Sequence, residues 1–252
     1  MDLSIVIPAF NESRKIGADI KAASIFLRDN HLTGEIIVVD DGSSNGTSEA
    51  AKTAGACLPA AIEFKVISYK QHRGKGYAIR RGVEASSSEY VMFADSGSCV
   101  PYSNVFKGLK LLQDDSCDIA HGSRKMRESQ IKRPQSLYRR ICSRIFHWFV
   151  VSFMKIPGEF TDTQCGFKIY KGQVARDLYG QCVSDGFMFD VEIIMRAQRQ
   201  GYRIKEFPIE WRCDRDSRLW PARNSLSLAS ELMTIKRAVA QTQQSDSGEK
   251  EN

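Results

Sequence analysis

Short apolar runs alternate with amphipathic segments along the N-terminal part of the chain. The apolar runs are rich in β-branched residues and end at turn-forming residues, which is typical of buried strands. They lie at Leu3–Ile7, Glu35–Val39, Ile62–Ser68 and Tyr90–Ala94. Between them, apolar residues recur at helical spacing over Ser13–Arg28, Thr47–Ala54 and Tyr77–Ala85. Because strands and helices alternate, we expect an α/β fold with a mostly parallel, helix-covered central sheet.

The pattern is less regular after residue 100. Helices are expected over Tyr102–Gln113, Ser136–Met154, Gly172–Leu178, Phe189–Gln200 and Ser225–Ala240. Short strands are expected at Asp118–His121, Phe167–Tyr170 and Tyr202–Trp211, and a basic loop at Lys125–Gln135. No linker-like composition separates the two regions, so we expect one domain over residues 1–240, made of about 1–100 and 101–240. The polar tail, 241–252, is expected to be disordered.

The composition is ordinary for a soluble globular protein, with 42% hydrophobic and 26% charged residues. The net charge of +6 suits a polyanionic ligand such as a nucleotide diphosphate, or an anionic membrane surface, and does not by itself indicate nucleic acid. The seven cysteines include no CxxC pair, so neither zinc nor a redox motif is indicated. Because no signal peptide and no membrane-spanning run is visible, we expect a cytoplasmic location.

A single carboxylate stands where the strand at Tyr90–Ala94 ends. Asp95 follows the strand directly, and Ser96–Ser98 then form a turn-like segment. The carboxyl ends of strands are where open α/β sheets bind their ligands. Asp95 is therefore a candidate ligand-binding residue, and the alternative is that it only caps a helix or closes a turn.

Two adjacent acids, Asp40 and Asp41, follow the strand at Glu35–Val39. Adjacent carboxylates repel each other, so they are expected to face different partners or cations. They could accept hydrogen bonds from a base and a ribose hydroxyl, and the alternative is an Asx-turn with a helix N-cap.

The segment Arg73–Gly76 places two cations and two glycines at the start of a helix. Backbone N–H groups and the helix dipole would join the side chains in binding a phosphate. The spacing is not that of a Walker A motif, and a solvated basic turn is the alternative.

Taken in order, these segments resemble the nucleotide-binding half of glycosyltransferase family 2 enzymes, whose GT-A fold is an α/β/α sandwich. The segments that carry the resemblance are SIVIPAFNES, EIIVVDDGSSNGT, HRGKGYAIRRG and YVMFADSG. Later segments resemble the polyprenyl-phosphate sugar transferases of that family, and most of all the dolichyl-phosphate glucosyltransferases. These segments are DTQCGFK (Asp162–Lys168), FDVEI (Phe189–Ile193) and EFPIEW (Glu206–Trp211).

The resemblance implies that one set of residues binds a nucleotide-sugar donor: Pro8, Phe10, Asn11, Glu12, Asp40, Asp41, Lys75, Asp95 and Arg218. The residues before 13 would line the base and ribose pocket, Lys75 would sit near the diphosphate or base, and Arg218 would belong to a lid. Asp95 matches the first acid of the family's DxD-type motif and is an expected catalytic residue and the expected metal ligand.

The sequence departs from that motif at Gly97, which stands where the second acid should be. A hard cation bound through diphosphate oxygens normally uses at least one protein carboxylate and gains affinity from a second. We therefore expect Mg²⁺ or Mn²⁺ to bind weakly, or to be held mostly by diphosphate and water. Loss of activity is the alternative.

For the acceptor, the resemblance implies that Arg124, Arg139 and Ser143 bind a lipid phosphate, with both arginines catalytic. Arg139 and Ser143 share one helix face, which could equally be a solvated basic surface. Further carboxylates that could touch the acceptor, or serve as general base toward a hydroxyl, are Asp162, Asp190 and Glu192.

The resemblance therefore predicts an inverting hexosyltransferase that moves glucose or a related sugar from a UDP-sugar to a polyprenyl phosphate. The alternatives are a family 2 enzyme that acts on a sugar hydroxyl and a catalytically silent nucleotide-sugar-binding module. The amphipathic segment 136–156 is either a peripheral membrane contact, which would place the protein at the cytoplasmic face of a membrane, or part of the core. No nucleic-acid partner is expected.

Overall fold

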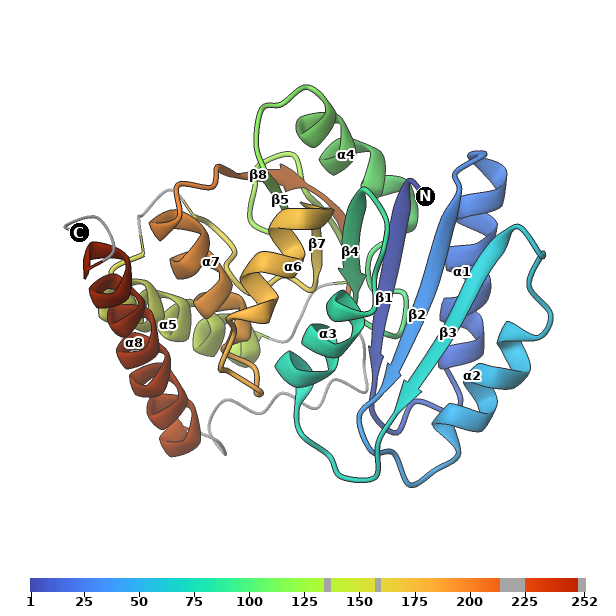
Figure 1. The fold of residues 1–252 in the computed structure, drawn as a ribbon, viewed down its shortest axis with the longest axis horizontal. Helices are drawn as coiled ribbons and strands as arrows, with labels where there is room; N and C mark the ends of the chain where they lie inside the picture. The colour runs from blue at the N-terminus through green and yellow to red at the C-terminus, as the bar shows by residue number, and fades with distance from the viewer. Residues whose placement is uncertain (134–136, 157–159, 214–224, 249–252) are drawn as a thin grey trace.

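A computed structural model describes residues 1–133, 137–156, 160–213 and 225–248 of the chain. Its main sheet has seven strands in the order β3-β2-β1-β4-β7-β5-β8 (Figure 1). A small second sheet pairs β6 with β9. The strands are β1 (Leu3–Ala9), β2 (Gly34–Asp40), β3 (Ile62–Ser68), β4 (Tyr90–Ala94), β5 (Ile119–Ser123), β6 (Gln130–Arg133), β7 (Phe167–Lys171), β8 (Ile204–Pro208) and β9 (Glu210–Arg212). The helices are α1 (Ile16–Asp29), α2 (Thr47–Gly55), α3 (Lys75–Glu84), α4 (Val105–Gln113), α5 (Leu137–Met154), α6 (Gly172–Gly180), α7 (Phe189–Arg199) and α8 (Ser225–Gly248), with the 3₁₀ turn η1 (Tyr102–Asn104) before α4.

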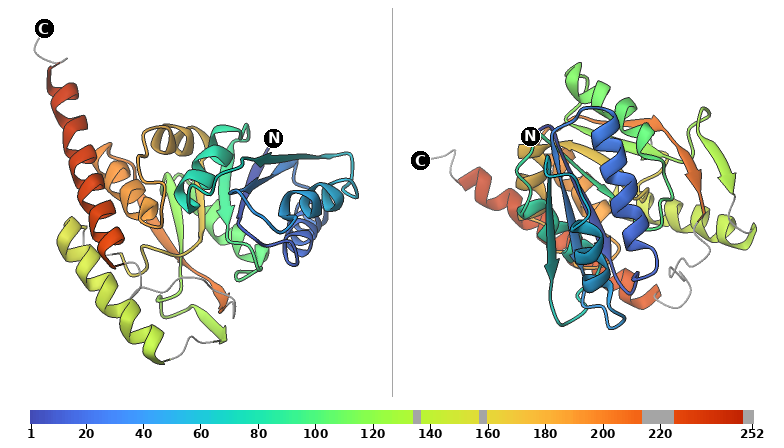
Figure 2. Two further views of the ribbon diagram at one scale, coloured as in Figure 1. Left: turned by 90° about the horizontal axis from the view of Figure 1, so that it is seen from below. Right: turned by 90° about the vertical axis from the view of Figure 1, so that its right-hand side faces the viewer.

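Helices cover both faces of the main sheet because its inner strands are apolar on both sides. Along β1, Ile5 and Ile7 pack toward α1, α2 and α4, while Val6 packs on the opposite face toward α3, α6 and α7. A third apolar cluster joins α5, α7 and α8, and Figure 2 shows α5 and α8 next to each other at the end of the molecule away from β3. The layered α/β architecture predicted from the sequence is confirmed.

One strand runs against the others. β7 lies between β4 and β5 and pairs antiparallel with both, while the remaining neighbours in the main sheet are parallel. The carboxyl ends of the parallel strands and the beginning of β7 therefore meet at the same edge of the sheet. This edge collects the loops that carry the candidate site residues.

Three of the expected elements differ from the observed ones. The late strand expected over Tyr202–Trp211 is divided into β8 and β9, which belong to different sheets, and the expected basic loop contains β6, which pairs with β9. The last helix continues past Ala240 to Gly248, so residues 241–248 of the expected disordered tail have helical backbone.

Candidate active site

Asp40, the first of the two adjacent acids, has a structural role. Its carboxylate accepts hydrogen bonds from the backbone N–H of Ser43 at 3.0 Å and from the hydroxyl of Ser48 at 2.6 Å. Ser43 belongs to the turn that leads into α2 and Ser48 to the first turn of that helix, and Asp40 is buried. The structure therefore favours the turn-and-cap alternative for Asp40 over the expected contact with a ligand.

Asp41 holds a different loop, so the pair divides its partners as expected. The Asp41 carboxylate accepts the backbone N–H groups of Arg73 at 2.8 Å and Gly74 at 2.9 Å, and its Oδ2 lies 2.8 Å from Nδ1 of His72. The His72 ring in turn stacks on Phe10, with ring centroids 4.0 Å apart. Asp41 thus fixes a flat aromatic surface at the end of β1. His72 had no assigned role in the sequence analysis, because only the fold brings it against Phe10.

The loop after β1 is tied to the loop after β2. The backbone N–H of Asn11 donates to Ser43 Oγ at 2.7 Å, and the Asn11 side-chain oxygen accepts from the N–H of Ser44 at 3.0 Å. The N–H of Glu12 donates to Thr47 Oγ1 at 2.9 Å. Pro8 is buried within β1, opposite Val39 of β2. The residues expected to line the base and ribose pocket thus lie together, and part of their role is to join these two loops.

The glycines of Arg73–Gly76 make room for another part of the chain. A Cβ on Gly74 would lie 2.3 Å from the carbonyl oxygen of Asp185, and one on Gly76 would lie 2.5 Å from that of Ser184. The N–H of Gly76 donates to the Gly186 carbonyl at 3.0 Å. These contacts place the segment 184–186 directly against the start of α3.

This packing corrects the expectation that the backbone of this segment cradles a phosphate. The N–H groups of residues 73 and 74 donate to Asp41, and those of residues 76 and 77 donate to carbonyl groups of Gly186 and Asp185. Four backbone donors at the helix start are therefore already satisfied by the protein. The Lys75 side chain is the group of this segment that points at Asp95, the acid expected to bind the nucleotide-sugar.

Lys75 and Asp95 form an ion pair at the sheet edge, with Lys75 Nζ 2.5 Å from Asp95 Oδ1. Burial by itself would lower the pKa of Lys75, but the carboxylates of Asp95 and Asp190 outweigh it and raise that pKa. Lys75 is therefore a firmly charged ammonium group. Asp95 is 39% exposed at its side chain, so it can still face a ligand.

Asp95 is also in direct contact with the DTQCGFK segment. Its backbone N–H donates to the Gly166 carbonyl at 3.2 Å. A Cβ on Gly166 would come within 2.0 Å of Asp95 Oδ2. Gly166 thus leaves the space that the Asp95 carboxylate occupies.

Asp95 is the partly exposed carboxylate that this place offers to a cation. Within the described ranges there is no group of three or more His, Cys, Asp or Glu side chains positioned to hold a metal ion. Gly97 adds no ligand, and Asp95 Oδ1 is already paired with Lys75 Nζ at 2.5 Å. These residues fit Mg²⁺ or Mn²⁺ only as an addition to a polyphosphate ligand that brings its own oxygens.

Behind Lys75 lies a second, fully buried ion pair. Lys168 Nζ is 2.6 Å from Asp190 Oδ1 and donates to the Cys165 carbonyl at 2.8 Å. Burial raises the pKa of Asp190, although Lys168 and Lys75 oppose the shift. Since Asp190 is buried and paired with Lys168, this contact gives it a role in holding that lysine, in place of the expected acceptor contact.

The contacts of Glu192 fit the expected role in acceptor binding even less well than those of Asp190. It has no exposed surface, and its carboxylate accepts the N–H groups of Val183 and Ser184 and pairs with Arg196 at 2.7 Å. Such contacts fix the segment before α7. The structure therefore corrects the expectation that Glu192 binds the acceptor.

Arg124 and Asp162 form a two-pronged ion pair, with Nε and Nη2 of Arg124 2.6 and 2.7 Å from the two carboxylate oxygens. Burial alone would raise the pKa of Asp162, but Arg124 outweighs it and holds that pKa well below its usual range. The Arg124 guanidinium also lies 5.4 Å from the Trp211 ring centroid. Asp162 therefore orients Arg124, and the expected direct contact between Asp162 and an acceptor is not supported by its geometry.

Arg124 faces a pocket of about 690 Å³ between α5 and the small sheet. The pocket is lined by Arg124, Lys125, Ile131, Arg140, Ser143, Arg144, His147, Thr161 and Trp211. Two of the three expected phosphate ligands, Arg124 and Ser143, thus come together. Arg140 and Arg144 line the same pocket. They are four residues apart and therefore share one helix face, and this spacing could have identified them from the sequence.

Two expected site residues cannot be placed. Arg139 belongs to α5, but its side chain is outside the described part of the structure, and Arg218 lies in the undescribed range 214–224.

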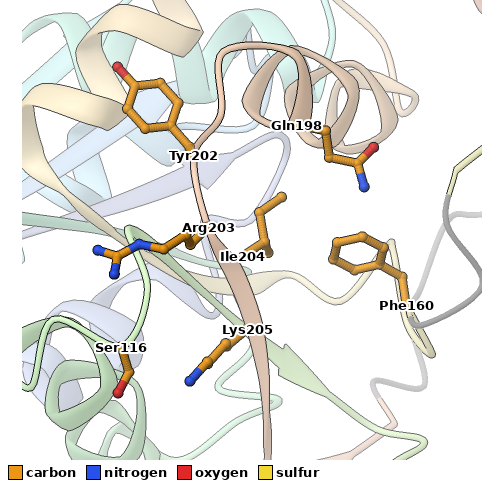
Figure 3. A pocket seen from close by; sticks show the side chains of 7 residues that line it. All are labelled: Ser116, Phe160, Gln198, Tyr202, Arg203, Ile204 and Lys205. Carbon is orange, nitrogen blue, oxygen red and sulfur yellow. The ribbon is translucent and has the colours of Figure 1, made fainter.

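A second pocket, of about 300 Å³, lies at the start of β8 around Tyr202–Lys205 (Figure 3). Arg124 follows the end of β5, which runs parallel to β8, so this smaller pocket belongs to the opposite end of the strands.

Comparison with known proteins gives consistent results at the level of the family. The sequence pattern of the glycosyl transferase family 2 matches residues 4–178. Dolichyl-phosphate beta-glucosyltransferase of Saccharomyces cerevisiae is 32% identical over 258 residues, covering 94% of this chain and 74% of that protein. The human protein of the same name is 32% identical over 245 residues, covering 93% and 74%.

Among solved structures, this fold is similar to glucosyl-3-phosphoglycerate synthase from Mycobacterium tuberculosis in complex with Mn²⁺, uridine diphosphate and phosphoglyceric acid. The TM-score is 0.69 at 20% identity, over 93% of this chain and 78% of that one. The same synthase in complex with Mg²⁺ and uridine diphosphate gives a TM-score of 0.68 at 19% identity, over 93% and 79%. This likeness confirms the expected GT-A fold.

Proposed function

The chain belongs to glycosyl transferase family 2, and from this premise we propose that it transfers glucose from a UDP-sugar to a polyprenyl phosphate of the dolichyl type. Relatives that are dolichyl-phosphate beta-glucosyltransferases cover more than nine-tenths of the chain, which supports both the sugar and the class of acceptor.

The donor lies along the edge formed by β1, β2 and β4. The base stacks near the Phe10–His72 pair beside Asp41, and the diphosphate reaches Lys75 and Asp95. Arg218 remains a proposed lid residue for the phosphates. A cation bound by Asp95 and the diphosphate would neutralise charge on the leaving group, as the Mn²⁺ and Mg²⁺ of similar structures suggest.

The observation that carries the proposal is the charge of the larger pocket. Among the described residues, its lining includes four cationic side chains, Arg124, Lys125, Arg140 and Arg144, and no carboxylate. Such a lining suits a phosphate group, which arginine binds with charge-assisted hydrogen bonds. Arg139 remains a proposed further ligand. The segment Asp162–Gly166 connects this pocket with the donor side, because Asp162 pairs with Arg124 and Gly166 contacts Asp95.

The state of the nearby carboxylates supports a phosphate over a sugar hydroxyl. A hydroxyl acceptor needs a general base. Asp162 is paired with Arg124, Asp190 with Lys168 and Glu192 with Arg196. A phosphate monoester, whose second pKa is about 6, is already an anion near neutral pH and needs no base.

The reaction is then a direct displacement with inversion. An oxygen of the acceptor phosphate attacks the anomeric carbon while the bond to the β-phosphate oxygen breaks, and UDP leaves with that electron pair. Lys75, charged and fixed beside Asp95, stabilises the developing negative charge on UDP. Arg124, oriented by Asp162, positions the attacking phosphate.

Helix α5 supports a peripheral membrane contact next to this pocket. Leu137 and Trp148 are each 70% exposed, and Tyr138, Ile141, Ile145 and Phe149 are exposed as well. The helix contains three arginines and no acidic residue. No helix among the described residues is long and apolar enough to cross a membrane. An apolar face with basic flanks is suited to lie on an anionic membrane, with the lipid chain of the acceptor beside it.

Turnover of a panel of UDP-sugars with a short-chain polyprenyl phosphate tests the function, in the presence of Mn²⁺ and of EDTA. The polyprenyl alcohol and a free glycan serve as alternative acceptors. We expect transfer of glucose to the phosphate alone. Transfer to the glycan would establish the hydroxyl-acceptor alternative, and UDP binding without any turnover would establish the silent binding module.

Co-sedimentation with anionic and neutral vesicles tests the membrane contact. Trp148→Ala and Leu137→Ala should reduce binding to anionic vesicles. Ile25→Ala is the matched control, because Ile25 is an exposed apolar residue on α1, outside this helix. Equal binding of all the variants, or no binding by the natural chain, would contradict the proposed contact.

A further inference from the structure

A buried carboxylate lies under the loop that lacks the second acid of the DxD-type motif. Asp19 is in the first turn of α1 and is only 3% exposed. Its Oδ2 accepts the backbone N–H of Gly97 at 2.8 Å, and its Oδ1 accepts the Ser98 hydroxyl at 2.7 Å. The carboxylate is thus directed at the position where the sequence departs from the family pattern.

These contacts hold an unusual backbone conformation. Gly97 has φ of 91° and Ser98 has φ of 48°, so two consecutive residues are in the left-handed region. Serine occupies this region only at a cost in free energy, so other contacts must hold it there. Hydrogen bonds to an ionised acceptor are among the stronger ones available, and Asp19 supplies one to each of the two residues.

The same geometry disfavours an acid at position 97. A side chain there would have to adopt the left-handed backbone that Gly97 tolerates. A carboxylate at 97 would also add a second negative charge beside that of Asp19, which costs free energy in a buried setting. The glycine and the carboxylate on α1 therefore belong together as one arrangement.

We propose that Asp19 is a positioning residue for the donor site: it fixes the loop Ser96–Ser98, so that Asp95 faces Lys75 and the donor diphosphate without a second loop acid. This inference rests on the proposed nucleotide donor. An anchoring role for α1 alone would not need Asp19, because Ile16, Ile20 and Leu27 already bury the helix in the core.

Binding of UDP in the presence of Mn²⁺, measured by calorimetry, tests the inference together with amide hydrogen exchange of residues 95–98. Asp19→Ala should raise the Kd of UDP about tenfold, the size expected for losing hydrogen bonds to a charged group, and should speed exchange at Gly97. Ser98→Ala, which removes only one of the two bonds, should have a smaller effect in the same direction. Asp29→Asn is the matched control, since Asp29 is an exposed acid at the other end of α1.

Unchanged UDP affinity and unchanged exchange in a folded Asp19→Ala variant would overturn the inference. If Asp19→Ala does not fold, the same two readouts on Ser98→Ala decide. If the natural chain does not bind UDP, the proposed donor is wrong, and the exchange measurement still reports whether Asp19 holds the loop.

A double-mutant cycle with Gly97→Asp tests the link between the two positions. Alone, Gly97→Asp should weaken UDP binding. Combined with Asp19→Asn, which removes the buried charge, it should weaken binding by less than the two separate effects together. Additive effects, or tighter Mn²⁺-dependent UDP binding by Gly97→Asp alone, would contradict the proposed arrangement.

Discussion

Gly166 and Asp95 are in contact so close that a methyl group on Gly166 would lie 2.0 Å from Asp95 Oδ2. The two residues come from different strands, Asp95 following β4 and Gly166 preceding β7, and the antiparallel pairing of these strands brings them together. The DTQCGFK segment therefore shapes the donor side of the site as well as the acceptor side.

Gly166→Ala should impair catalysis while the protein remains folded. The atom in the way is the end of the Asp95 side chain, which can rotate, so the added methyl group displaces the carboxylate and leaves the backbone in place. Misplacing a reacting or binding group by about 1 Å costs roughly a hundredfold in rate, so a loss of kcat/KM of this order is expected in steady-state assays. Gly180→Ala is the control, because a Cβ there meets nothing within 4 Å. Equal activity of the two variants would contradict this role for Gly166.

Asp40 and Asp41 should respond differently to replacement. Asp40→Ala removes the hydrogen bonds to Ser43 and Ser48 and should lower the free energy of unfolding by about 1–2 kcal/mol, with little change in the Kd of UDP. Asp41→Ala releases the loop that carries His72, and should weaken UDP binding about tenfold. Chemical denaturation and calorimetry measure the two quantities. If Asp40→Ala weakened UDP binding and Asp41→Ala lowered only the free energy of unfolding, Asp40 would be the ligand-binding acid.

The Arg124–Asp162 pair should make stability depend on pH. Arg124 depresses the pKa of Asp162 in the folded state, so the stabilisation is fully present above the unfolded value of about 3.9 and is lost as the pH falls toward the folded value. Asp162→Asn should lower the free energy of unfolding by about 3 kcal/mol at pH 7. The difference from the natural chain should shrink at pH 3. Urea denaturation at both pH values tests this, and a difference independent of pH would contradict it.

Glu231 of α8 should influence the donor site from a distance. Its carboxylate accepts the N–H groups of Gly186 and Met188 and a hydrogen bond from the Ser184 hydroxyl. Ser184 and Gly186 belong to the segment that packs on Gly74 and Gly76. Glu231→Gln should therefore loosen the segment and raise the KM for the UDP-sugar several-fold, an effect of about 1 kcal/mol.

Steady-state kinetics with the donor varied measures this effect. The control is Ser230→Ala, an exposed neighbour on the same helix. A change confined to kcat, or the same change in the control, would exclude the proposed coupling through residues 184–186.

The sequence was sufficient to predict the architecture of the first half because local patterns determine it. β1 and β2 are apolar on both faces, and Asp41 and Asp95 follow their strands at the sheet edge where parallel strands place such residues. The parallel pairing then follows from the alternation of strands and helices.

The rest depends on partners that are far apart in the chain. Arg124 pairs with a residue 38 positions later, and Lys168 with one 22 positions later. Nothing in the local pattern distinguishes such a paired, buried carboxylate from one that is open to a ligand. In the same way, Gly74 could leave room for a phosphate or for protein, and the contact with Asp185, more than a hundred residues later, decides for protein.

The position of β7 also has a consequence for how the protein folds. β5 precedes β7 in the chain, yet within the main sheet its neighbours are β7 and β8, both of which come later. The half-sheet β3-β2-β1-β4 can assemble from the first part of the chain, but the outer edge of β4 has no partner until residues 167–171 arrive. A growing chain therefore carries an unpaired, apolar strand edge through the synthesis of some seventy residues, the period in which aggregation and chaperone binding compete with folding.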